Sequence, residues 1–374
     1  MSILHIITSL RTGGAERLVA GLALRLHRAG DEVAVLVFDG TRTPLMEELE
    51  CGGVPVFSLG KGAQAMYNPL NLLKLRRFLR KQPFDIIHTH NTPCQFLAAL
   101  APCRTRITTE HNTTNRRRKW TWFRPVDRWL YGRYGKIVCV GDKTRDDLAA
   151  WLDRPNLSAR MTVIPNGIDL HRFAAASRKG EGTVGPSTSS GTNGFTILMV
   201  AAFRPQKDQA SLIRALSLLP GEYRLQLAGG SETARDDTTF SSCRNLVREL
   251  GLEDRVGFLG VRSDIPELVA ACDVFVLSTS YEGFGLAALE AMAAAKPVIA
   301  SDVPGLSDLV AGAGVLVPPS NPQALAEAIR SLCENPDEAR RIGGKCQERA
   351  QKYDIDETVR KYRLLYGLVQ GATS

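Results

Sequence analysis

The sequence predicts an α/β protein made of two doubly wound, Rossmann-like domains that face each other across a cleft. Short β-branched runs such as ILHIITS and EVAVLVF alternate with segments of helical period, a pattern typical of a parallel sheet covered by helices on both faces. The alternation stops in a Gly/Ser/Thr-rich stretch, residues 174–194, and then restarts. A chain of 374 residues is long enough for about two domains, each with its own core.

The elements follow one another in the same order in both halves. The first half has the strand-like runs ILHIITS, EVAVLVF, DIIHTH, RITTEH, KIVCV and MTVIPN. Between the first two runs, AERLVAGLALRLHRAG places Leu18, Leu22 and Leu26 on one helical face. The second half restarts with FTILMVAAF, YRLQLAGG, VGFLG, DVFVLS, PVIAS and GVLVPP. The second half is therefore expected to repeat the architecture of the first.

These observations define four predicted regions. Residues 1–173 form the N-terminal Rossmann-like domain, and residues 174–194 form a flexible interdomain segment. Residues 195–352 form the C-terminal Rossmann-like domain, and residues 353–374 form a helix that crosses back to the N-terminal domain. Ligands of doubly wound sheets bind beyond the carboxyl ends of the strands, so the cleft between the domains is the expected site.

Composition limits the class of protein. The eight cysteines include no C-x-x-C pair and lie mostly in apolar runs, so buried reduced thiols in a reducing compartment are expected. No apolar run approaches the roughly 18 residues of a membrane span, and the N-terminus lacks a basic n-region. We expect neither a transmembrane helix nor a signal peptide, and a cytoplasmic protein that is either free or peripheral on the inner face of the membrane.

Positive charge is concentrated in the first half. Residues 1–170 hold 25 Lys and Arg against 15 Asp and Glu, whereas the remainder holds 22 against 24. This asymmetry predicts an anionic partner, either a membrane surface or a nucleic acid. The sequence shows no zinc-ligand spacing, RNP-like stretch or long basic helix, so a nucleic-acid partner is not expected.

Two strand-end turns are candidate phosphate sites. Gly13 and Gly14 follow the first strand and open a helix, where backbone N–H groups can approach a phosphate. Arg204 and Lys207 follow the first strand of the second half, where two cations can clamp a diphosphate. Taken alone, the glycine pair is equally a plain turn, and the two cations equally form the solvated start of a helix.

The stretch YEGFGLAALEAMA places Glu282 just before a Gly-Phe-Gly turn and Glu290 in the first two turns of the following helix. The turn and the helix start consist of Gly283, Phe284, Gly285 and Leu286. Unpaired N–H groups at such a helix start favour an anion, and the two carboxylates can accept hydrogen bonds from hydroxyls on either side of it. Hydroxyls that flank a diphosphate indicate a nucleotide-sugar. The alternative is an acidic N-terminal residue and a solvated helix residue.

Motifs of one known family run along nearly the whole chain. They are, in order, RTGGAERL, DIIHTHNTP, TTEHN, VIPNGIDLHRF, AAFRPQKD, VGFLG, DVFVLSTSYEGFGLAALEAMAAAKPVIAS and VLVPPSNPQALAEAI. With these motifs the sequence resembles the retaining glycosyltransferases of family 4, also called glycosyltransferase group 1, which have the GT-B fold. The segment with two glutamates eight positions apart is highly specific, and IPNGID is specific.

The resemblance implies a nucleotide-diphosphate sugar as donor substrate, no cofactor, and a glycan or lipid-linked acceptor on the N-terminal domain. Gly14, with Gly13 before it, would place backbone amides against the donor diphosphate. Arg204 and Lys207 would bind the diphosphate and stabilise the charge that develops on it, which is the metal's role in other enzymes. Glu282 would contact the hydroxyls of the donor sugar, and the turn that follows would complete the donor site.

Other positions are carried over in the same way. Glu290 would hold the ribose, and His111 would lie near the sugar ring and the acceptor as a catalytic residue. His88 and His90 match a family feature, for which we expect a structural role. The resemblance also implies a hinge at IPNGID, where Asn and Gly tolerate the positive φ of such turns.

Two stretches depart from the pattern of the family, and a third matches the metal signature of a different glycosyltransferase fold. Asp308 in GLSDLV stands where the family often has a longer Glu, so it is left out of the binding set. LAGGSETARDD lacks the family's usual Gly-x-Gly, which leaves the base-side contacts open. Asp354 and Asp356 form a D-x-D sequence, but they precede a helical run and are interpreted as helix-capping residues. We predict no metal site.

Two other classes of function remain as alternatives: an inert nucleotide-sugar-binding protein of the same fold, and a nucleotide-sugar epimerase or a phosphorylase of similar fold. The inert protein should lack part of the charge-stabilising set, all of which is present here. An epimerase should turn over its donor without any acceptor. Donor base, donor sugar and acceptor identity cannot be derived from the sequence.

The densest basic stretch is RRRKWTWFRPVDRW, residues 116–129, with six Lys and Arg, one Asp and four aromatic residues. Basic side chains beside tryptophans suit a membrane headgroup region. The predicted membrane or acceptor surface consists of Arg116, Arg117, Arg118, Lys119, Trp120 and Trp122. An acceptor-binding loop without membrane contact, and ordinary core packing of the aromatic rings, are the alternatives.

Overall fold

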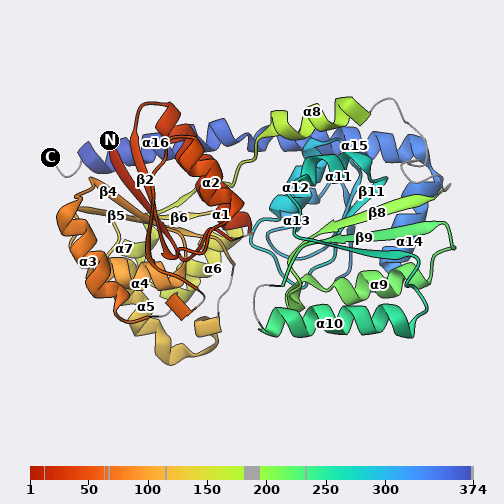
Figure 1. The fold of residues 1–374 in the computed structure, drawn as a ribbon, viewed down its shortest axis with the longest axis horizontal. Helices are drawn as coiled ribbons and strands as arrows, with labels where there is room; N and C mark the ends of the chain where they lie inside the picture. Colours follow the sequence, from red (N-terminus) through yellow and green to blue (C-terminus); the bar gives the residue numbers. More distant parts are fainter. Residues whose placement is uncertain are drawn as a thin grey trace. The chain divides into compact units, whose positions relative to one another are not determined.

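The computed structural model describes residues 1–11, 13–62, 64–65, 68–113, 116–180, 194–231 and 234–371 of the chain. The chain divides into two compact units (Figure 1). Unit 1 consists of Met1–Gly167 and Ile355–Ser374, and unit 2 consists of Ile168–Asp354. Each unit contains one parallel sheet with helices on both faces, as the sequence predicted.

Unit 1 contains a seven-stranded sheet in the order β3-β2-β1-β4-β5-β6-β7, in which every pairing is parallel. Its strands are β1 (Ser2–Ile7), β2 (Glu32–Asp39), β3 (Val56–Gly60), β4 (Ile86–Thr89), β5 (Thr105–Glu110), β6 (Lys136–Cys139) and β7 (Met161–Val163). The strand order reverses between β1 and β4. Such a reversal is where doubly wound sheets bind ligands.

The helices of unit 1 divide into two layers (Figure 1). One layer contains α1 (Gly14–Arg28), α2 (Pro44–Cys51) and α16 (Ile355–Gly371). The other contains α3 (Asn71–Lys81), α4 (Thr92–Leu100), α5 (Arg124–Gly132) and α6 (Asp142–Leu152). The short helix α7 (Pro155–Ser158) and the 3₁₀ turns η2 (Arg116–Lys119) and η3 (Thr121–Phe123) complete the unit. Side chains of alternate residues along each strand pack against one layer or the other, which buries both faces of the sheet.

Unit 2 repeats this plan with six parallel strands in the order β10-β9-β8-β11-β12-β13. Its strands are β8 (Phe195–Val200), β9 (Tyr223–Ala228), β10 (Val256–Gly260), β11 (Val274–Leu277), β12 (Val298–Ser301) and β13 (Val315–Val317). Its helices are α8 (Leu170–Gly180), α9 (Gln209–Ser217), α10 (Ala234–Glu249), α11 (Ile265–Ala271), α12 (Leu286–Ala293), α13 (Ser307–Val310), α14 (Pro322–Glu334) and α15 (Pro336–Ala350), with the 3₁₀ turns η4 (Pro205–Lys207) and η5 (Gln351–Tyr353). The strand order reverses between β8 and β11.

The C-terminal helix α16 belongs to unit 1 although it follows unit 2 in the chain. It packs against α1, where Arg25 Nε donates a hydrogen bond of 2.7 Å to Asp356 Oδ1. Thr358 Oγ1 donates to the carbonyl oxygen of Pro165 at 3.2 Å. Tyr362 and Tyr366 are fully buried against the sheet of unit 1.

The segment expected to be flexible is partly helical. Helix α8 extends through residues 174–180, and it packs against α11 within unit 2. The guanidinium of Arg172 donates a hydrogen bond of 3.3 Å to the carbonyl oxygen of Ser263. Alanine-rich sequence at 174–176 favours a helix, so the expected start of the flexible segment was wrong. The remainder of that segment, residues 181–193, lies outside the described residues.

The hinge prediction at Asn166 and Gly167 was partly wrong in its physical reason. The division between the units falls directly after Gly167. Neither residue has a positive φ, however, so neither adopts the left-handed backbone conformation that was the reason for the prediction. Asn166 is instead buried, with 5% of its surface exposed.

The cysteines agree with the sequence prediction. All eight are free, and six of them are buried: Cys94, Cys139, Cys243, Cys272, Cys333 and Cys346. Burial raises the pKa of the Cys243 thiol to about 11, which keeps it protonated at neutral pH. Within the described residues, no helix is long and apolar enough to cross a membrane.

Candidate functional site

The strand-order reversal of unit 2 holds the predicted phosphate clamp. The turn η4 follows β8, with Arg204 at its start and Lys207 at its end. The Lys207 N–H donates to the Arg204 carbonyl oxygen at 2.8 Å. Asp208 then adopts a left-handed conformation with φ of 46°, and its side chain accepts a hydrogen bond from the Ser211 N–H at 3.3 Å, which caps α9. The two cations thus stand on a backbone turn that is fixed at both ends.

Hydrogen bonds join this turn to the loop after β11. The carbonyl oxygen of Gln206 accepts from Thr279 Oγ1 at 2.8 Å and from the Ser280 N–H at 2.8 Å. The Thr279 N–H in turn donates to Ser301 Oγ, which lies at the end of β12. Three neighbouring strand ends therefore share one hydrogen-bonded network.

Lys207 and Glu282 form an ion pair across these two loops. The ammonium group of Lys207 donates to Glu282 Oε2, and Glu282 Oε1 accepts from the Gly283 N–H at 3.1 Å. The Lys207 side chain is 21% exposed and the Glu282 side chain 17% exposed, so both remain reachable from solvent. The structure thereby brings together two residues that the sequence predicted separately.

Glycines determine how α12 begins beside this pair. Gly285 has φ of 89°, and a Cβ atom there would lie 2.5 Å from Leu306 Cδ1. Gly305 has φ of 85°, and a Cβ atom there would lie 2.4 Å from the Glu282 carbonyl oxygen. Only glycine tolerates both the left-handed backbone and the close approach. The helix N-terminus is therefore held against the Glu282 loop.

The other predicted residues of this region lie on or beside α12. Phe284 is buried and its ring packs edge-on against Tyr353, with ring centroids 5.4 Å apart, so its contribution to a ligand site would come from its backbone. Leu286 is the first residue of α12, and Glu290 is half-buried in the second turn. The arrangement offers cations, a helix N-terminus and a carboxylate at one strand-order reversal.

In unit 1, Gly13 caps the N-terminus of α1 and Gly14 is its first residue, so the glycine pair opens a helix after β1 as the sequence predicted. Gly13 is extended, with φ of −171°, so its conformation does not require glycine. A Cβ atom at Gly13 would, however, lie 2.1 Å from Glu16 Oε2. The carboxylate of Glu16 thus lies against the backbone at the start of α1, a contact that the sequence did not reveal.

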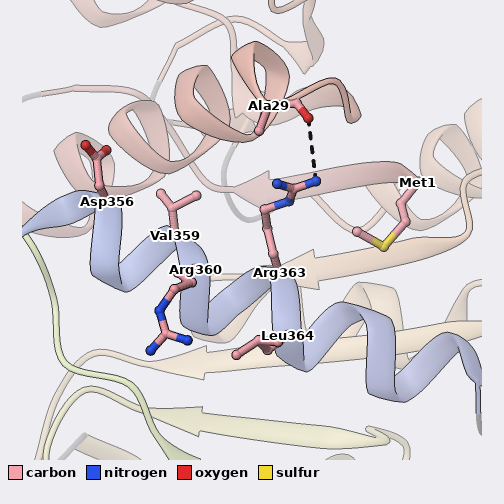
Figure 2. Close-up of a pocket in the computed structure, with 7 residues that line it drawn as sticks. All are labelled: Met1, Ala29, Asp356, Val359, Arg360, Arg363 and Leu364. Carbon is pink, nitrogen blue, oxygen red and sulfur yellow. Dashed lines mark hydrogen bonds between the residues drawn. The ribbon is translucent and has the colours of Figure 1, made fainter.

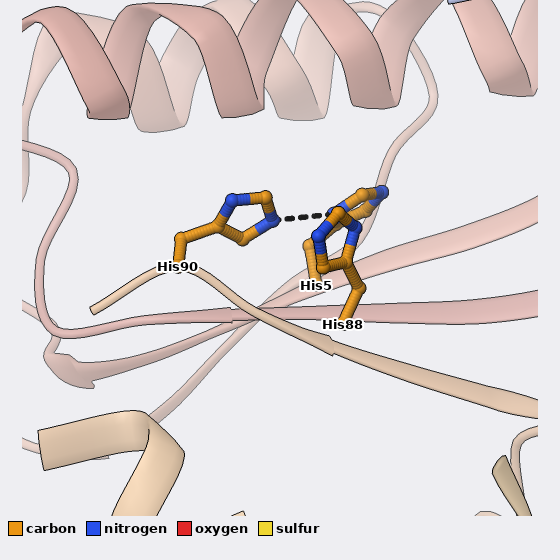
Figure 3. A group of neighbouring side chains, drawn as sticks. All are labelled: His5, His88 and His90. Atoms are coloured by element: carbon orange, nitrogen blue, oxygen red, sulfur yellow. Dashed lines mark hydrogen bonds between the residues drawn. The ribbon is translucent and has the colours of Figure 1, made fainter. Parts of the chain in front are cut away.

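A cluster of buried imidazoles lies near the strand-order reversal of unit 1 (Figure 3). His5 Nδ1 and His90 Nε2 are 2.9 Å apart, and His90 Nδ1 and His111 Nε2 are 3.3 Å apart. His88 uses Nδ1 to bond Tyr366 Oη and Nε2 to bond Thr109 Oγ1, both at 2.7 Å. His5 was not among the residues predicted from the sequence, although a histidine within the apolar run ILHII was a visible signal.

Burial keeps these imidazoles neutral. It lowers the pKa of His5 to about 3 and that of His111 to about 4. Burial, together with the neighbouring imidazoles, also holds the pKa values of His88 and His90 well below the ordinary value. A neutral imidazole carries one N–H donor and one bare nitrogen acceptor.

The basic stretch differs from the prediction at two of its arginines. Arg117 Nε lies 2.8 Å from Asp127 Oδ1, and both side chains are buried. An Arg118 nitrogen lies 3.1 Å from Glu110 Oε2, again with both side chains at most 8% exposed. A buried carboxylate must be paired, so these two arginines hold the η2 turn onto the fold rather than face a membrane. Their assignment to a membrane surface was wrong.

The aromatic part of the stretch is exposed. Trp120 is 54% exposed, Trp122 is 67% exposed and Trp129 is 45% exposed. Lys119 is also exposed. These tryptophans are not core residues, which removes the alternative of ordinary core packing for them.

A hollow of about 450 Å³ opens on unit 1 away from the predicted site residues (Figure 2). It lies between the N-terminus of the chain and α16, and is lined by Met1, Ala29, Asp356, Val359, Arg360, Arg363 and Leu364. Its cations are already paired: Arg360 with Glu357, and Arg363 with Asp31 at 3.2 Å. The hollow therefore lacks an unpaired charge with which to select an anionic ligand.

Comparison with known proteins identifies the class. Residues 12–172 match the family described as Glycosyltransferase Family 4, and residues 186–349 match the family described as Glycosyl transferases group 1. Together the two matches extend through both units. The chain therefore belongs to the group 1 glycosyltransferases and has the GT-B fold. It is a hexosyltransferase-type enzyme that transfers a sugar from a nucleotide donor.

Individual relatives agree with this class. The chain is 30% identical over 259 residues to the UDP-Gal:alpha-D-GlcNAc-diphosphoundecaprenol alpha-1,3-galactosyltransferase of Escherichia coli, a match that covers 64% of this chain and 63% of that enzyme. It is 26% identical to the GDP-mannose:cellobiosyl-diphosphopolyprenol alpha-mannosyltransferase of Xanthomonas oryzae over 97% of this chain and 95% of that enzyme. The fold matches that of Anabaena HepE in complex with UDP and glucose, with a TM-score of 0.84, 24% identity, and 98% and 99% of the two chains covered.

The first prediction concerns the buried ion pair of η2. Arg117→Ala should lower the free energy of unfolding of unit 1 by about 3–5 kcal/mol, because it leaves the buried charge of Asp127 without its cation and with the hydrogen bond from Trp151 Nε1 as its remaining support. All four tryptophans lie between residues 120 and 151, so tryptophan fluorescence during urea unfolding reports on unit 1. The exposed control Lys119→Ala should change stability by no more than about 0.5 kcal/mol. Equal losses in the two variants would contradict the structural role.

The second prediction concerns pH. The folded pKa values of His5 and His111 lie below the ordinary value of about 6.5, so the unfolded chain binds protons that folded unit 1 does not. The free energy of unfolding should therefore fall as the pH drops below about 6.5, by about 1.4 kcal/mol per pH unit for each such histidine, until its folded pKa is reached.

The measurement is urea unfolding by tryptophan fluorescence at pH 7, 6 and 5. His5→Asn serves as the control, because asparagine does not titrate. This variant should reduce the slope of stability against pH by about 1.4 kcal/mol per unit. A slope that His5→Asn leaves unchanged would show that His5 is already protonated in the folded unit.

Proposed function

We propose that this enzyme transfers a sugar from a nucleoside-diphosphate donor to a lipid-linked acceptor of cell-envelope polysaccharide synthesis, with retention of the anomeric configuration and without a metal. The lipid-linked acceptor is supported by two relatives, whose names specify diphosphoundecaprenol-linked and diphosphopolyprenol-linked sugars. Retention follows from the family resemblance. Metal independence is supported by the cations at the strand-order reversal of unit 2.

The observation that carries the proposal is the Lys207–Glu282 pair beside the N-terminus of α12. A donor sugar nucleotide presents a diphosphate next to sugar hydroxyls. The Lys207 ammonium and the helix N–H groups match the diphosphate, and the Glu282 carboxylate matches the hydroxyls. Glu290, one helical turn further along, is assigned to the ribose. In unit 1, the backbone amides at Gly13 and Gly14 are assigned to a phosphate group.

The chemistry follows from charge development. When the anomeric C–O bond breaks, negative charge grows on the departing diphosphate and positive charge grows on the sugar ring. Arg204, Lys207 and the helix amides stabilise the negative charge on the diphosphate, because they occupy fixed positions and need no reorganisation. Glu282 lowers the energy of the sugar as it becomes positive, and His111 contacts the sugar ring or the acceptor. We assign no side chain as a covalent nucleophile.

Donor binding tests the proposal directly. Thermal-shift screening against UDP-, GDP- and ADP-sugars should identify the donor, since a ligand at 100 times its Kd stabilises a protein by about 2.7 kcal/mol. The absence of a shift with all three would argue strongly against a nucleotide-sugar enzyme. Turnover of the donor without an acceptor would favour an epimerase.

The third prediction tests the phosphate clamp. Arg204→Ala and Lys207→Ala should each lower turnover by roughly 10²–10³, because each removes a fixed charge that acts mainly in the transition state. The control is Arg214→Ala, which removes an exposed cation from α9. Release of nucleoside diphosphate measures turnover, and unfolding curves establish that the variants are folded. Turnover like that of the native enzyme in both clamp variants would remove the diphosphate assignment.

Membrane association is a separate part of the proposal. The exposed tryptophans Trp120, Trp122 and Trp129, here called the tryptophan patch, are amphipathic bodies suited to the headgroup region. The surrounding half of the chain is basic, which matches anionic lipid. Because Arg117 and Arg118 are committed to buried ion pairs, insertion of the tryptophans carries more of the binding than the sequence suggested.

The fourth prediction concerns this patch. The double variant Trp120→Ser, Trp122→Ser should lower co-sedimentation with phosphatidylglycerol-containing vesicles by at least about tenfold, since each ring loses more than 1 kcal/mol of apolar burial. The control Leu218→Ser removes an exposed apolar side chain from unit 2. Binding should weaken with salt. Equal binding to neutral and anionic vesicles, or equal binding by the double variant, would contradict docking.

A further inference from the structure

A continuous chain of hydrogen bonds leads from the core of unit 1 to His111. His5 is fully buried in β1, His90 follows β4, and His111 follows β5 and is half-buried. Figure 3 shows the bond between the rings of His5 and His90, which is 2.9 Å long, and the contact from His90 to His111 is 3.3 Å. At its two ends, His5 Nε2 and His111 Nδ1 are buried atoms without a hydrogen-bond partner among the described residues.

The three rings can share protons in only two ways. A neutral His90 carries one proton, so it donates to one neighbour and accepts from the other. Either every ring holds its proton on Nδ1, or every ring holds it on Nε2. One end of the chain is then an N–H without a partner, and the other end is a bare nitrogen.

Burial decides between the two arrangements. A buried N–H without a partner is costlier and rarer than a bare acceptor. With protons on Nε2, that N–H would be locked in the core at His5, which has 0% exposure. With protons on Nδ1, it lies at His111, which is only half-buried and is the end of these hydrogen bonds nearer to solvent, although Nδ1 itself is covered in this structure.

A metal ion fits this cluster poorly. Nitrogen atoms of His5, His88 and His90 lie within 4.8 Å of one another, which makes the group a candidate for a metal. Both nitrogens of His88 already bond oxygen atoms, and His5 and His90 bond each other. Among these three described residues, only His5 Nε2 lacks a partner, and one nitrogen cannot hold a metal ion.

We propose that His5 is a positioning residue that acts through His90 to fix the tautomer of His111, so that His111 presents Nδ1–H as a hydrogen-bond donor toward the reacting sugar or acceptor. This inference rests on the proposed function for the location of substrate. It assigns His111 the role of a donor to an oxygen atom, and it excludes the role of a general base acting through Nδ1. The low pKa of His111 agrees, since the ring stays neutral throughout the physiological range.

Two variants of similar shape, His5→Asn and His5→Asp, distinguish the two directions in which these hydrogen bonds can run. In His5→Asn, an amide N–H can take the place of Nδ1–H and preserve the direction. In His5→Asp, a carboxylate can only accept, so His90 must donate to it and His111 must then hold its proton on Nε2. Tyr366→Phe is the matched control, because it removes the buried hydrogen bond to His88 and leaves the hydrogen bonds among His5, His90 and His111 in place.

The primary readout is the ¹⁵N spectrum of histidine-labelled protein, which distinguishes a protonated from a bare ring nitrogen. The expected result is Nδ1-protonated His5, His90 and His111 in the native enzyme, an unchanged His111 in His5→Asn and Tyr366→Phe, and Nε2-protonated His111 in His5→Asp. Nε2-protonated His111 in the native enzyme would overturn the inference, as would stoichiometric zinc in the purified protein. The native spectrum decides the direction even if His5→Asp does not fold.

The second readout is turnover with the donor that the thermal-shift screen identifies. His5→Asp should lower kcat by about tenfold relative to His5→Asn with little change in the KM for donor, which corresponds to one hydrogen bond of about 1.4 kcal/mol in the transition state. The predicted tautomers with equal kcat in both variants would overturn the positioning role. The spectra do not depend on any donor, so failure of the proposed function remains distinguishable from failure of the histidine chain.

Discussion

The parallel direction of every strand is the constraint on which the rest of the structure depends. In a parallel sheet all carboxyl ends lie at one edge, so the loops that follow the strands collect there. In unit 2 the strand order reverses between β8 and β11, and the two loops that follow these strands remain close enough to form hydrogen bonds with each other. The Gln206 carbonyl oxygen, which accepts hydrogen bonds from both Thr279 and Ser280, fixes that distance. Residues 75 positions apart in the chain, Lys207 and Glu282, therefore meet.

The same constraint explains why so much could be predicted from the sequence. Strand and helix periods identify the alternation, and the alternation implies a parallel sheet, so candidate residues could be placed at strand ends without knowledge of any contact. Side-chain partners could not be placed in this way. Arg117 was assigned to a membrane surface because it stands in a run of four basic residues beside tryptophans, yet its neighbour across the fold is the buried Asp127. His5 was overlooked because one polar residue in an apolar strand has no periodic signal, and only its register opposite His88 reveals its partners.

Buried polar contacts fix the position of the loop that follows β5 in unit 1. Glu110 ends β5 and accepts a hydrogen bond from the buried Tyr131, while the Arg118 guanidinium neutralises its charge. His111, the next residue, is held from the other side by His90. A side chain that must meet a substrate oxygen within a few tenths of an ångström benefits from supports on both sides. The arginines that the sequence assigned to a partner thus serve the position of a predicted catalytic residue.

Electrostatics at the proposed donor site can be understood in the same terms. A carboxylate beside a diphosphate site would repel the donor if it stood alone. Glu282 is instead paired with Lys207, and because both side chains are partly exposed, the pair contributes little stability of its own and opens at little cost. In the proposed function, a donor that brings a diphosphate to Lys207 would also bring hydroxyls to Glu282, so each charge would exchange one partner for another. A ligand with only one of these two groups would leave the other charge unpaired, and the pair therefore favours ligands in which phosphate and sugar are joined.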